Sequence, residues 1–146
     1  MISLLVPTRG RPQMLLQLFR SAAATAHGAF EVCAWLDDDD RKRSQYPIRQ
    51  RIKYGSGPRP FSDSGVLCSS ELWNNAFSMA SGDIVGLIGD DSVIETPGWD
   101  EQIEDAFKQT PDRLLLVYPE DKTGRRRPET LFVSREWVET VGQLTP

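Results

Sequence analysis

Apolar residues along this chain follow two spacings that alternate from one end to the other. Short uninterrupted apolar runs are typical of strands buried on both faces, as in parallel sheets. Between them, apolar residues recur every three or four positions, which predicts amphipathic helices. The predicted strands are residues 2–6, 30–36, 51–54, 83–89, 114–118 and 130–134. The predicted helices are residues 12–26, a segment after Gly65 that ends near Ala80, residues 99–107 and residues 135–141.

Strands that alternate with helices predict an α/β fold, with a mainly parallel sheet and helices on both faces. The chain has 146 residues, and we expect residues 1–146 to form a single domain. Pro7 is expected to end the first strand, and Gly82 is placed to cap the helix that ends near Ala80. Residues 55–65 predict a loop long enough to be functional, and residues 119–129 predict a charged loop.

Charge and cysteine content exclude some classes of partner. The 17 Lys and Arg against 21 Asp and Glu give a formal charge of −4, so general binding to nucleic acid is not expected. Cys33 and Cys68 show no metal-ligand spacing and are interpreted as reduced, buried small hydrophobes, which fits a cytoplasmic protein. No apolar run approaches the ~20 residues that span a bilayer, so no membrane span is expected.

Three polar clusters follow predicted strands: the turn PTRGRP, the four aspartates after Leu36, and the pair Asp90 and Asp91. In doubly wound sheets, ligands bind beyond the carboxyl ends of the strands, near the point where strand order reverses. Two carboxylates after an apolar strand favour a bound Mg²⁺ or Mn²⁺ ion, with substrate phosphates completing the shell. A solvated acidic turn is the alternative interpretation of this pair.

The other two clusters favour a nucleotide or another phosphate-bearing ligand. Most of the four aspartates are interpreted as a solvated acidic turn, and one of them is placed to accept a hydrogen bond from the N–H of a nucleobase. Arg9 and Arg11 lie near the positive end of a helix dipole, where phosphate binds favourably, and a surface arginine pair is the alternative. The chain has no Walker-type loop and no GxGxxG fingerprint, which disfavours an NTPase or a dinucleotide dehydrogenase.

The opening ISLLVPTRGRP, the strand FEVCAWLDD and the segment WNNAFSMASGDIVGLIGDDSVIETPGWDEQI resemble a family-two glycosyltransferase of the Rossmann-like GT-A fold. The resemblance covers nearly the whole chain. It implies a nucleotide-diphosphate sugar donor, with a UDP-sugar favoured, and an Mn²⁺ or Mg²⁺ cofactor. It also implies inverting transfer to an acceptor hydroxyl of unknown identity, in which a general base deprotonates that hydroxyl and the metal stabilises the departing diphosphate.

The resemblance carries individual site residues onto this chain. Asp91 and Asp90 match the last two positions of the family's acidic motif, which implies that they bind the metal. Asp38 matches the acid that recognises the nucleobase. Arg59 matches a basic residue that the family carries in the loop before the helix that ends near Ala80. The nucleotide-binding residues implied are Pro7, Thr8, Arg9, Asp38, Arg59, Asn74 and Asp90.

This chain departs from the family pattern in two places. Gly89 replaces the first aspartate of the usual acidic triplet, and the family's acceptor-binding half ordinarily follows the region where this chain ends. The late carboxylates are Glu120, Asp121 and Glu129, none of which is singled out, so the catalytic residue stays unknown.

Three alternative functions remain. The first is a non-catalytic module that binds a nucleotide or nucleotide sugar and lacks the acceptor half. A receiver-type phosphoacceptor is disfavoured because it expects a Lys after a late strand, where this chain has Pro119. A nucleotidyltransferase is weaker still, since TRGR only faintly matches its glycine-rich opening.

Overall fold

The computed structural model describes residues 1–120, 122 and 129–145, and within them six strands form one sheet in the order β3-β2-β1-β4-β6-β5. In chain order the elements are β1 (Ile2–Thr8), α1 (Pro12–Thr25), β2 (Phe30–Asp37), the 3-10 helix Arg43–Gln45, β3 (Ile52–Gly57), α2 (Ser69–Phe77), β4 (Ile84–Leu87), α3 (Trp99–Lys108), β5 (Leu116–Val117), β6 (Leu131–Ser134) and α4 (Arg135–Val141).

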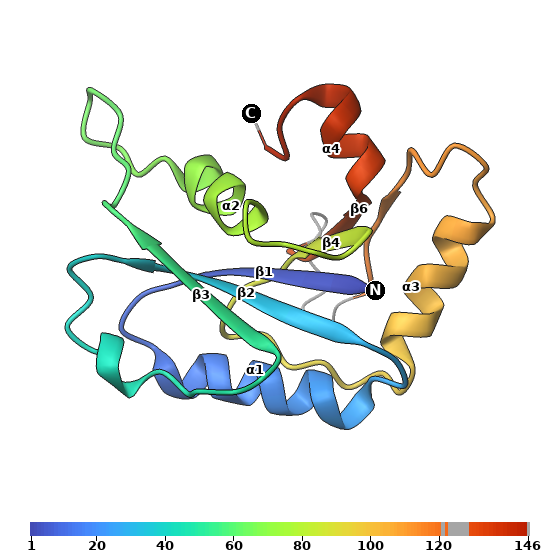
Figure 1. Cartoon of the computed structure of the whole chain (residues 1–146), viewed down its shortest axis with the longest axis horizontal. Helices are drawn as coiled ribbons and strands as arrows, with labels where there is room; N and C mark the ends of the chain where they lie inside the picture. The colour runs from blue at the N-terminus through green and yellow to red at the C-terminus, as the bar shows by residue number, and fades with distance from the viewer. Residues whose placement is uncertain (121, 123–128, 146) are drawn as a thin grey trace.

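The first four strands are parallel, and the last two run antiparallel to their neighbours. β1 pairs with β2 on one side and with β4 on the other, so the strand order reverses at β1. The carboxyl ends of β1, β2 and β3 meet at one edge of the molecule, on the left in Figure 1. The crevice between the ends of β1 and β4 is therefore the position where such sheets bind ligands.

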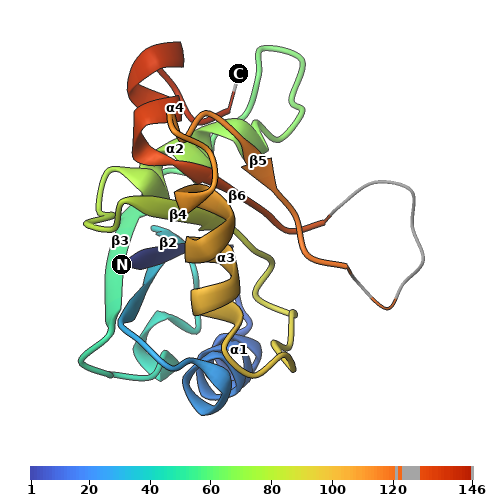
Figure 2. The same cartoon turned by 90° about the vertical axis from the view of Figure 1, so that its right-hand side faces the viewer.

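Helices cover both faces of the sheet, as the sequence predicts. Figure 2 shows α1 below the strands and α2 with α4 above them. The larger core cluster joins α1 and α3 to one face through residues such as Leu18, Ile103 and Phe107, while Leu5, Ala76 and Val138 join α2 and α4 to the other. Among the described residues, no helix is long and apolar enough to cross a membrane.

β1 continues through Pro7, where the sequence predicts its end. The backbone N–H of Ile88 donates to the carbonyl of Leu5, so the backbone polar groups of Leu5 point toward β4. Those of Pro7, two residues later, point to the same side. The pairing of β1 with β4 ends at Leu5, so no residue of β4 lies opposite Pro7. The backbone N–H that proline lacks is therefore not needed for pairing with β4. The strand therefore carries Thr8 to the edge of the crevice.

β3 extends to Gly57, so the prediction that residues 55–57 belong to a loop is wrong. Trp35 on β2 lies flat against this strand, and a Cβ on Gly55 would come within 2.6 Å of its ring and of Met79 Sδ. Glycine here permits close packing of strand and indole, which is a known use of glycine inside strands. The sequence pattern does not show that the Trp35 indole packs on Gly55.

The predicted capping role of Gly82 is also wrong, because α2 ends at Phe77 and its C-cap is Ser78. The Gly82 N–H donates to Ser3 Oγ at 2.8 Å, and a Cβ on Gly82 would lie 2.6 Å from the carbonyl oxygen of Met1. Gly82 therefore allows the chain entering β4 to pass closely over the start of β1.

The predicted buried strand 114–118 is reduced to β5, a two-residue strand at the sheet edge. Leu114, Leu116 and Tyr118 are exposed, so the apolar run does not mark a core strand. β6 lies between β4 and β5 and is the buried strand of this region. Most of the predicted charged loop 119–129 lies outside the described residues.

Candidate functional site

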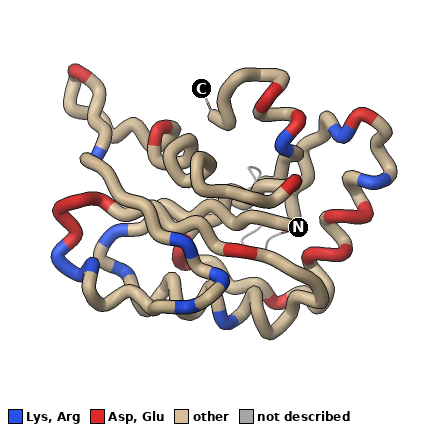
Figure 3. Tube along the Cα trace, in the orientation of Figure 1, with Lys and Arg blue, Asp and Glu red and all other residues tan. Residues whose placement is uncertain are grey.

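Three segments that are far apart in the sequence meet at the carboxyl ends of the strands. They are the turn after β1 (residues 8–11), the acidic segment after β2 (residues 37–40) and residues 89–91 after β4. Acidic and basic segments lie side by side at this edge, on the left in Figure 3. Because parallel strands deliver their ends to one edge, the fold brings together the three polar clusters recognised in the sequence.

Asp90 is the most buried carboxylate of this site, with 2% of its side chain exposed. Thr8 Oγ1 donates to Asp90 Oδ2 at 2.5 Å across the β1–β4 crevice. Arg11 Nη1 lies 3.2 Å from the other oxygen, Asp90 Oδ1. A buried carboxylate is costly without such partners, so Thr8 and Arg11 hold Asp90 in place and fix its orientation.

Asp91 differs from its neighbour because 65% of its side chain is exposed. Its Oδ2 lies 3.8 Å from Arg11 Nη1, and its Oδ1 lies over Gly89. A Cβ on Gly89 would come within 2.7 Å of Asp91 Oδ1, so any other residue at that position would force this carboxylate to move. Gly89 is thus compatible with the position that the Asp91 side chain has here.

The acidic segment after β2 separates into buried and exposed members. Asp37 has 4% of its side chain exposed and accepts from Arg9 Nη1 and Arg59 Nη1, each at 2.7 Å. Asp38, the residue implied by the resemblance, is 56% exposed and lies 3.6 Å from Arg43 Nη1. The Asp38 carboxylate therefore faces solvent at the mouth of the site, while Asp37 anchors two arginines inside it.

Arg9 also binds Asp39, and these two ion pairs tie the β1 turn to the acidic segment. The bonds to Asp39 and Asp37 raise the pKa of the exposed Arg9 guanidinium, and the Arg9 bond holds the pKa of Asp39 below its usual range. Arg59, at the start of the loop after β3, lies 5.9 Å from the ring of Phe61. Two arginines from different loops thus converge on Asp37.

Asp40 and Tyr46 form a buried pair that sequence reasoning missed. Tyr46 OH donates to Asp40 Oδ2 at 2.9 Å, and Gly10 N–H donates to the same oxygen at 2.8 Å. Burial alone would raise the pKa of Asp40, but the bonds from Gly10, Lys42 and Tyr46 outweigh it and lower that pKa. In the sequence Asp40 is indistinguishable from its three acidic neighbours, and no pattern connects it to Tyr46.

Asn74 is the implied site residue whose side chain is most fully engaged elsewhere. Its Oδ1 accepts from the N–H groups of Leu144 and Thr145 at 3.1 and 3.2 Å, and its Nδ2 donates to the Thr145 carbonyl. In this structure Asn74 therefore holds the segment after α4 against α2. Its implied role in nucleotide binding stays a prediction.

The donor set around Asp90 and Asp91 fits a hard divalent cation. Among the described residues no three His, Cys, Asp or Glu side chains cluster as a metal site, and the carboxylates adjacent here are those of Asp90 and Asp91. Mg²⁺ and Mn²⁺ are often held this way, with phosphate and water oxygens in the remaining positions. Arg11 already lies beside both carboxylates, which shows that the position attracts positive charge.

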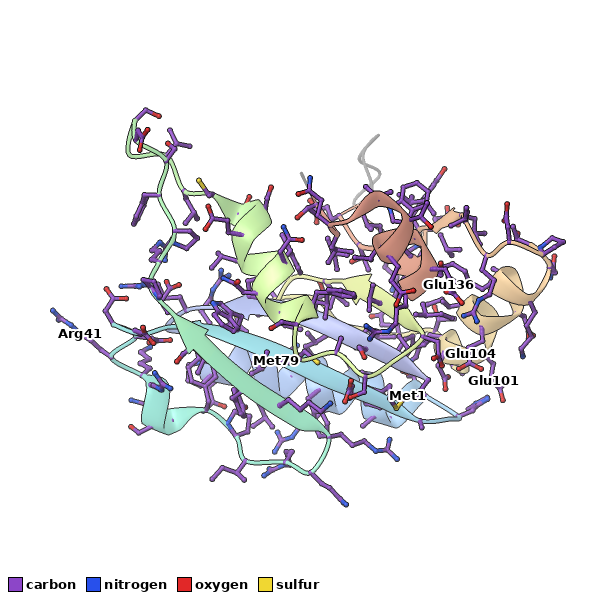
Figure 4. The ribbon with its side chains drawn as sticks, turned by 45° about the horizontal axis from the view of Figure 1, so that its top comes forward. Met1, Arg41, Met79, Glu101, Glu104 and Glu136 are labelled. Atoms are coloured by element: carbon purple, nitrogen blue, oxygen red, sulfur yellow. The ribbon has the colours of Figure 1, made fainter. Side chains whose placement is uncertain are left out.

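A hollow of about 500 Å³ lies at the acidic segment after β2, lined by Arg9, Gly10, Asp39, Asp40, Arg41 and Lys42. A second hollow of about 210 Å³ lies at the opposite end of the sheet, where the Met1 ammonium is 3.3 Å from Glu104. Figure 4 shows Met1 beside Glu104 and Arg41 at the far end of the molecule. The first hollow is lined by two of the three converging segments, the turn after β1 and the acidic segment after β2.

The late carboxylates do not single out a general base. Glu120 and Glu129 are exposed, and Asp121 lies outside the described residues. The general base therefore stays unassigned.

Sequence comparison places the chain in a known family. The family model described as "Glycosyl transferase family 2" matches residues 3–138, which is most of the chain. No curated protein sequence matches it. The family match confirms the resemblance drawn from the sequence motifs.

Solved structures confirm the fold class. S. aureus TarS in complex with UDP-GlcNAc is 17% identical, with a TM-score of 0.69 over 97% of this chain and 47% of that one. A mannosyltransferase of Pyrobaculum calidifontis in complex with GDP-Man and Mn²⁺ is 14% identical, with a TM-score of 0.70 over 97% and 46%. Glucosyl-3-phosphoglycerate synthase of Mycobacterium tuberculosis, with Mn²⁺, UDP and phosphoglyceric acid, is 16% identical, with a TM-score of 0.63 over 92% and 56%. The chain spans about half the length of these proteins.

Proposed function

Because the chain belongs to glycosyl transferase family 2, we propose that it binds a nucleotide-diphosphate sugar and transfers the sugar to an acceptor hydroxyl. The observation that carries the proposal is the pair Asp90 and Asp91 at the β1–β4 crevice. One carboxylate is buried and held by Thr8, and the other is exposed toward solvent. This arrangement suits a cation shared between the protein and a diphosphate.

The nucleotide is proposed to lie along the β1 turn and the acidic segment after β2. Pro7, Thr8 and Arg9 would border the nucleoside, and the Asp38 carboxylate, 56% exposed and 3.6 Å from Arg43 Nη1, would accept from a nucleobase N–H. Arg59 and Asn74 complete the proposed binding residues, together with Asp90. A UDP-sugar is the favoured donor, because S. aureus TarS and the M. tuberculosis synthase were crystallised with UDP-GlcNAc and UDP.

Mn²⁺ or Mg²⁺ is the proposed cofactor, held by Asp91 and Asp90, and it would supply charge stabilisation for the departing diphosphate. Thr8 orients Asp90 through its 2.5 Å hydrogen bond, and Arg9 is kept at the nucleotide side by Asp37 and Asp39. The proposed transfer inverts the anomeric centre, with the acceptor hydroxyl attacking directly. A cytoplasmic location stays a prediction.

The first test is ligand-induced stabilisation. Thermal unfolding is measured with UDP and with GDP, each with and without Mn²⁺, because a ligand that binds only the folded state raises its melting temperature. We expect UDP with Mn²⁺ to give the largest increase, and Asp91→Ala to abolish the Mn²⁺-dependent part. Asp63→Ala is the matched control, since Asp63 is also exposed and lies in the loop after β3. An equal UDP response with and without Mn²⁺ in the wild type contradicts the metal site.

The second test separates an enzyme from a binding module. UDP release from UDP-GlcNAc is followed with Mn²⁺ present, with water or added sugars as acceptors. Release that is lost in Asp91→Ala supports transfer. Binding without release over many hours supports the alternative function, a module that binds nucleotide sugars and does not turn them over.

A further inference from the structure

Arg11 is the basic residue that faces the proposed metal ligands. Its Nη1 lies 3.2 Å from Asp90 Oδ1 and 3.8 Å from Asp91 Oδ2, so one nitrogen serves both carboxylates. Among the described residues no other arginine or lysine is paired with either aspartate. Arg9 and Arg59 are directed to Asp37, and Arg43 lies beside Asp38.

The guanidinium and a divalent cation compete for these oxygens. Mg²⁺ coordinated by carboxylate oxygens lies about 2.1 Å from them, so an undisplaced Arg11 would hold its positive charge within a few ångströms of the ion. Half of the Arg11 side chain is exposed, and the residue makes no side-chain cap at the start of α1. Its other side-chain contact is an exposed hydrogen bond from Nη1 to Met14 Sδ at 4.0 Å, so the side chain can leave the carboxylates while its backbone stays fixed.

The position of Arg11 also defines where it can go. A diphosphate bound to a cation at Asp91 would be within reach of the Arg11 side chain, whose Nη1 lies 3.8 Å from that carboxylate. Guanidinium groups bind phosphate oxygens through charge-assisted and often bidentate hydrogen bonds. The start of α1, where Arg11 is the N-cap residue, further favours negative charge.

We propose that Arg11 couples metal binding to nucleotide binding by exchanging partners. Without ligands it neutralises Asp90 and Asp91 and weakens their affinity for a free cation. When the cation arrives with a nucleoside diphosphate, Arg11 releases the carboxylates and binds the diphosphate. Each ligand then increases the affinity for the other, and that coupling is reciprocal by thermodynamic necessity. The nucleotide part of this inference rests on the proposed function.

The test measures binding rather than turnover. Mn²⁺ affinity is determined from the electron paramagnetic resonance signal of the free ion, first with MnCl₂ alone and then with UDP. In Arg11→Gln, loss of the competing charge should tighten binding of Mn²⁺ alone about fivefold. Loss of the phosphate contact should weaken UDP binding at saturating Mn²⁺ about tenfold. With the affinity for UDP in the absence of metal unchanged, the factor by which UDP increases Mn²⁺ affinity should therefore fall about tenfold.

Two further variants isolate the cause. Arg11→Lys keeps the positive charge, so its affinity for Mn²⁺ alone should stay close to that of the wild type. Arg20→Gln removes an exposed arginine of the same helix that has no ion pair among the described residues, and it should change neither affinity. If Arg11→Gln does not fold, Arg11→Lys still tests the phosphate contact through a UDP affinity reduced relative to Arg20→Gln.

The outcomes distinguish this inference from the proposed function. Unchanged affinity for Mn²⁺ alone in Arg11→Gln, or equal tightening in Arg11→Lys, overturns the exchange even if the wild type binds UDP with Mn²⁺. A wild type that binds Mn²⁺ but not UDP or GDP refutes the proposed function instead. In that case tighter Mn²⁺ binding by Arg11→Gln would still support competition between Arg11 and the cation.

Discussion

Tyr46→Phe removes one hydroxyl from the buried network beneath the candidate site. The lost donor contacts Asp40 Oδ2 at 2.9 Å, while Gly10 and Lys42 N–H still bind the carboxylate. A hydrogen bond to a buried charged group contributes roughly 1.5–3 kcal/mol, so the variant should be about 2 kcal/mol less stable. Phenylalanine keeps the ring that packs on Tyr54 at 6.1 Å between centroids, which confines the change to the hydroxyl.

Thermal unfolding is the assay for this prediction. For a domain of this size, about 2 kcal/mol corresponds to a decrease in melting temperature of roughly 4–8 °C. Tyr118→Phe is the matched control, since Tyr118 is exposed, and its change should stay within about 0.5 kcal/mol.

A double-mutant cycle with Asp40→Asn then tests the pairing itself. Because the two side chains are in contact, the effects of the single variants should not add, and the coupling should reach about 1 kcal/mol. A melting temperature of Tyr46→Phe equal to that of Tyr118→Phe, or a cycle that closes additively, would refute the reasoning.

Three other predictions follow from the same structure. Asp38→Ala should leave the melting temperature unchanged and reduce discrimination between UDP and GDP, whereas Asp37→Asn should lower the melting temperature because Arg9 and Arg59 lose their shared partner. Gly55→Ala should destabilise the fold by roughly 1–3 kcal/mol, because its Cβ would meet the Trp35 ring; a Gly55→Ala protein as stable as Ser56→Ala would contradict this packing. The lowered pKa of Asp40 means that its stabilisation is complete above the unfolded pKa of about 4 and is lost as pH falls through the folded pKa, so the melting temperatures of wild type and Asp40→Asn should converge below about pH 4.

The sequence by itself determined the fold class and the position of the acidic pair. Burial on both faces makes a parallel strand apolar throughout, and a helix must bury one stripe, so the two spacings are visible without coordinates. Strand ends in such a sheet share one edge, which placed the PTRGRP turn, the acidic segment and Asp90 together before any distance was known. Local spacing was sufficient because these features depend on the chain near each residue.

Tertiary structure alone decided which members of each polar cluster are buried and what holds them. Four adjacent aspartates are equivalent in sequence. In the structure, Asp37 pairs with two arginines, Asp40 accepts a hydrogen bond from Tyr46, and Asp38 is exposed. Gly55 was predicted to lie in a loop because of the Gly, Pro and Ser content around it. The contact that explains a glycine there comes from Trp35, which lies on another strand. Such choices depend on groups distant along the chain, and desolvation, packing and charge pairing act only after the fold has brought them together.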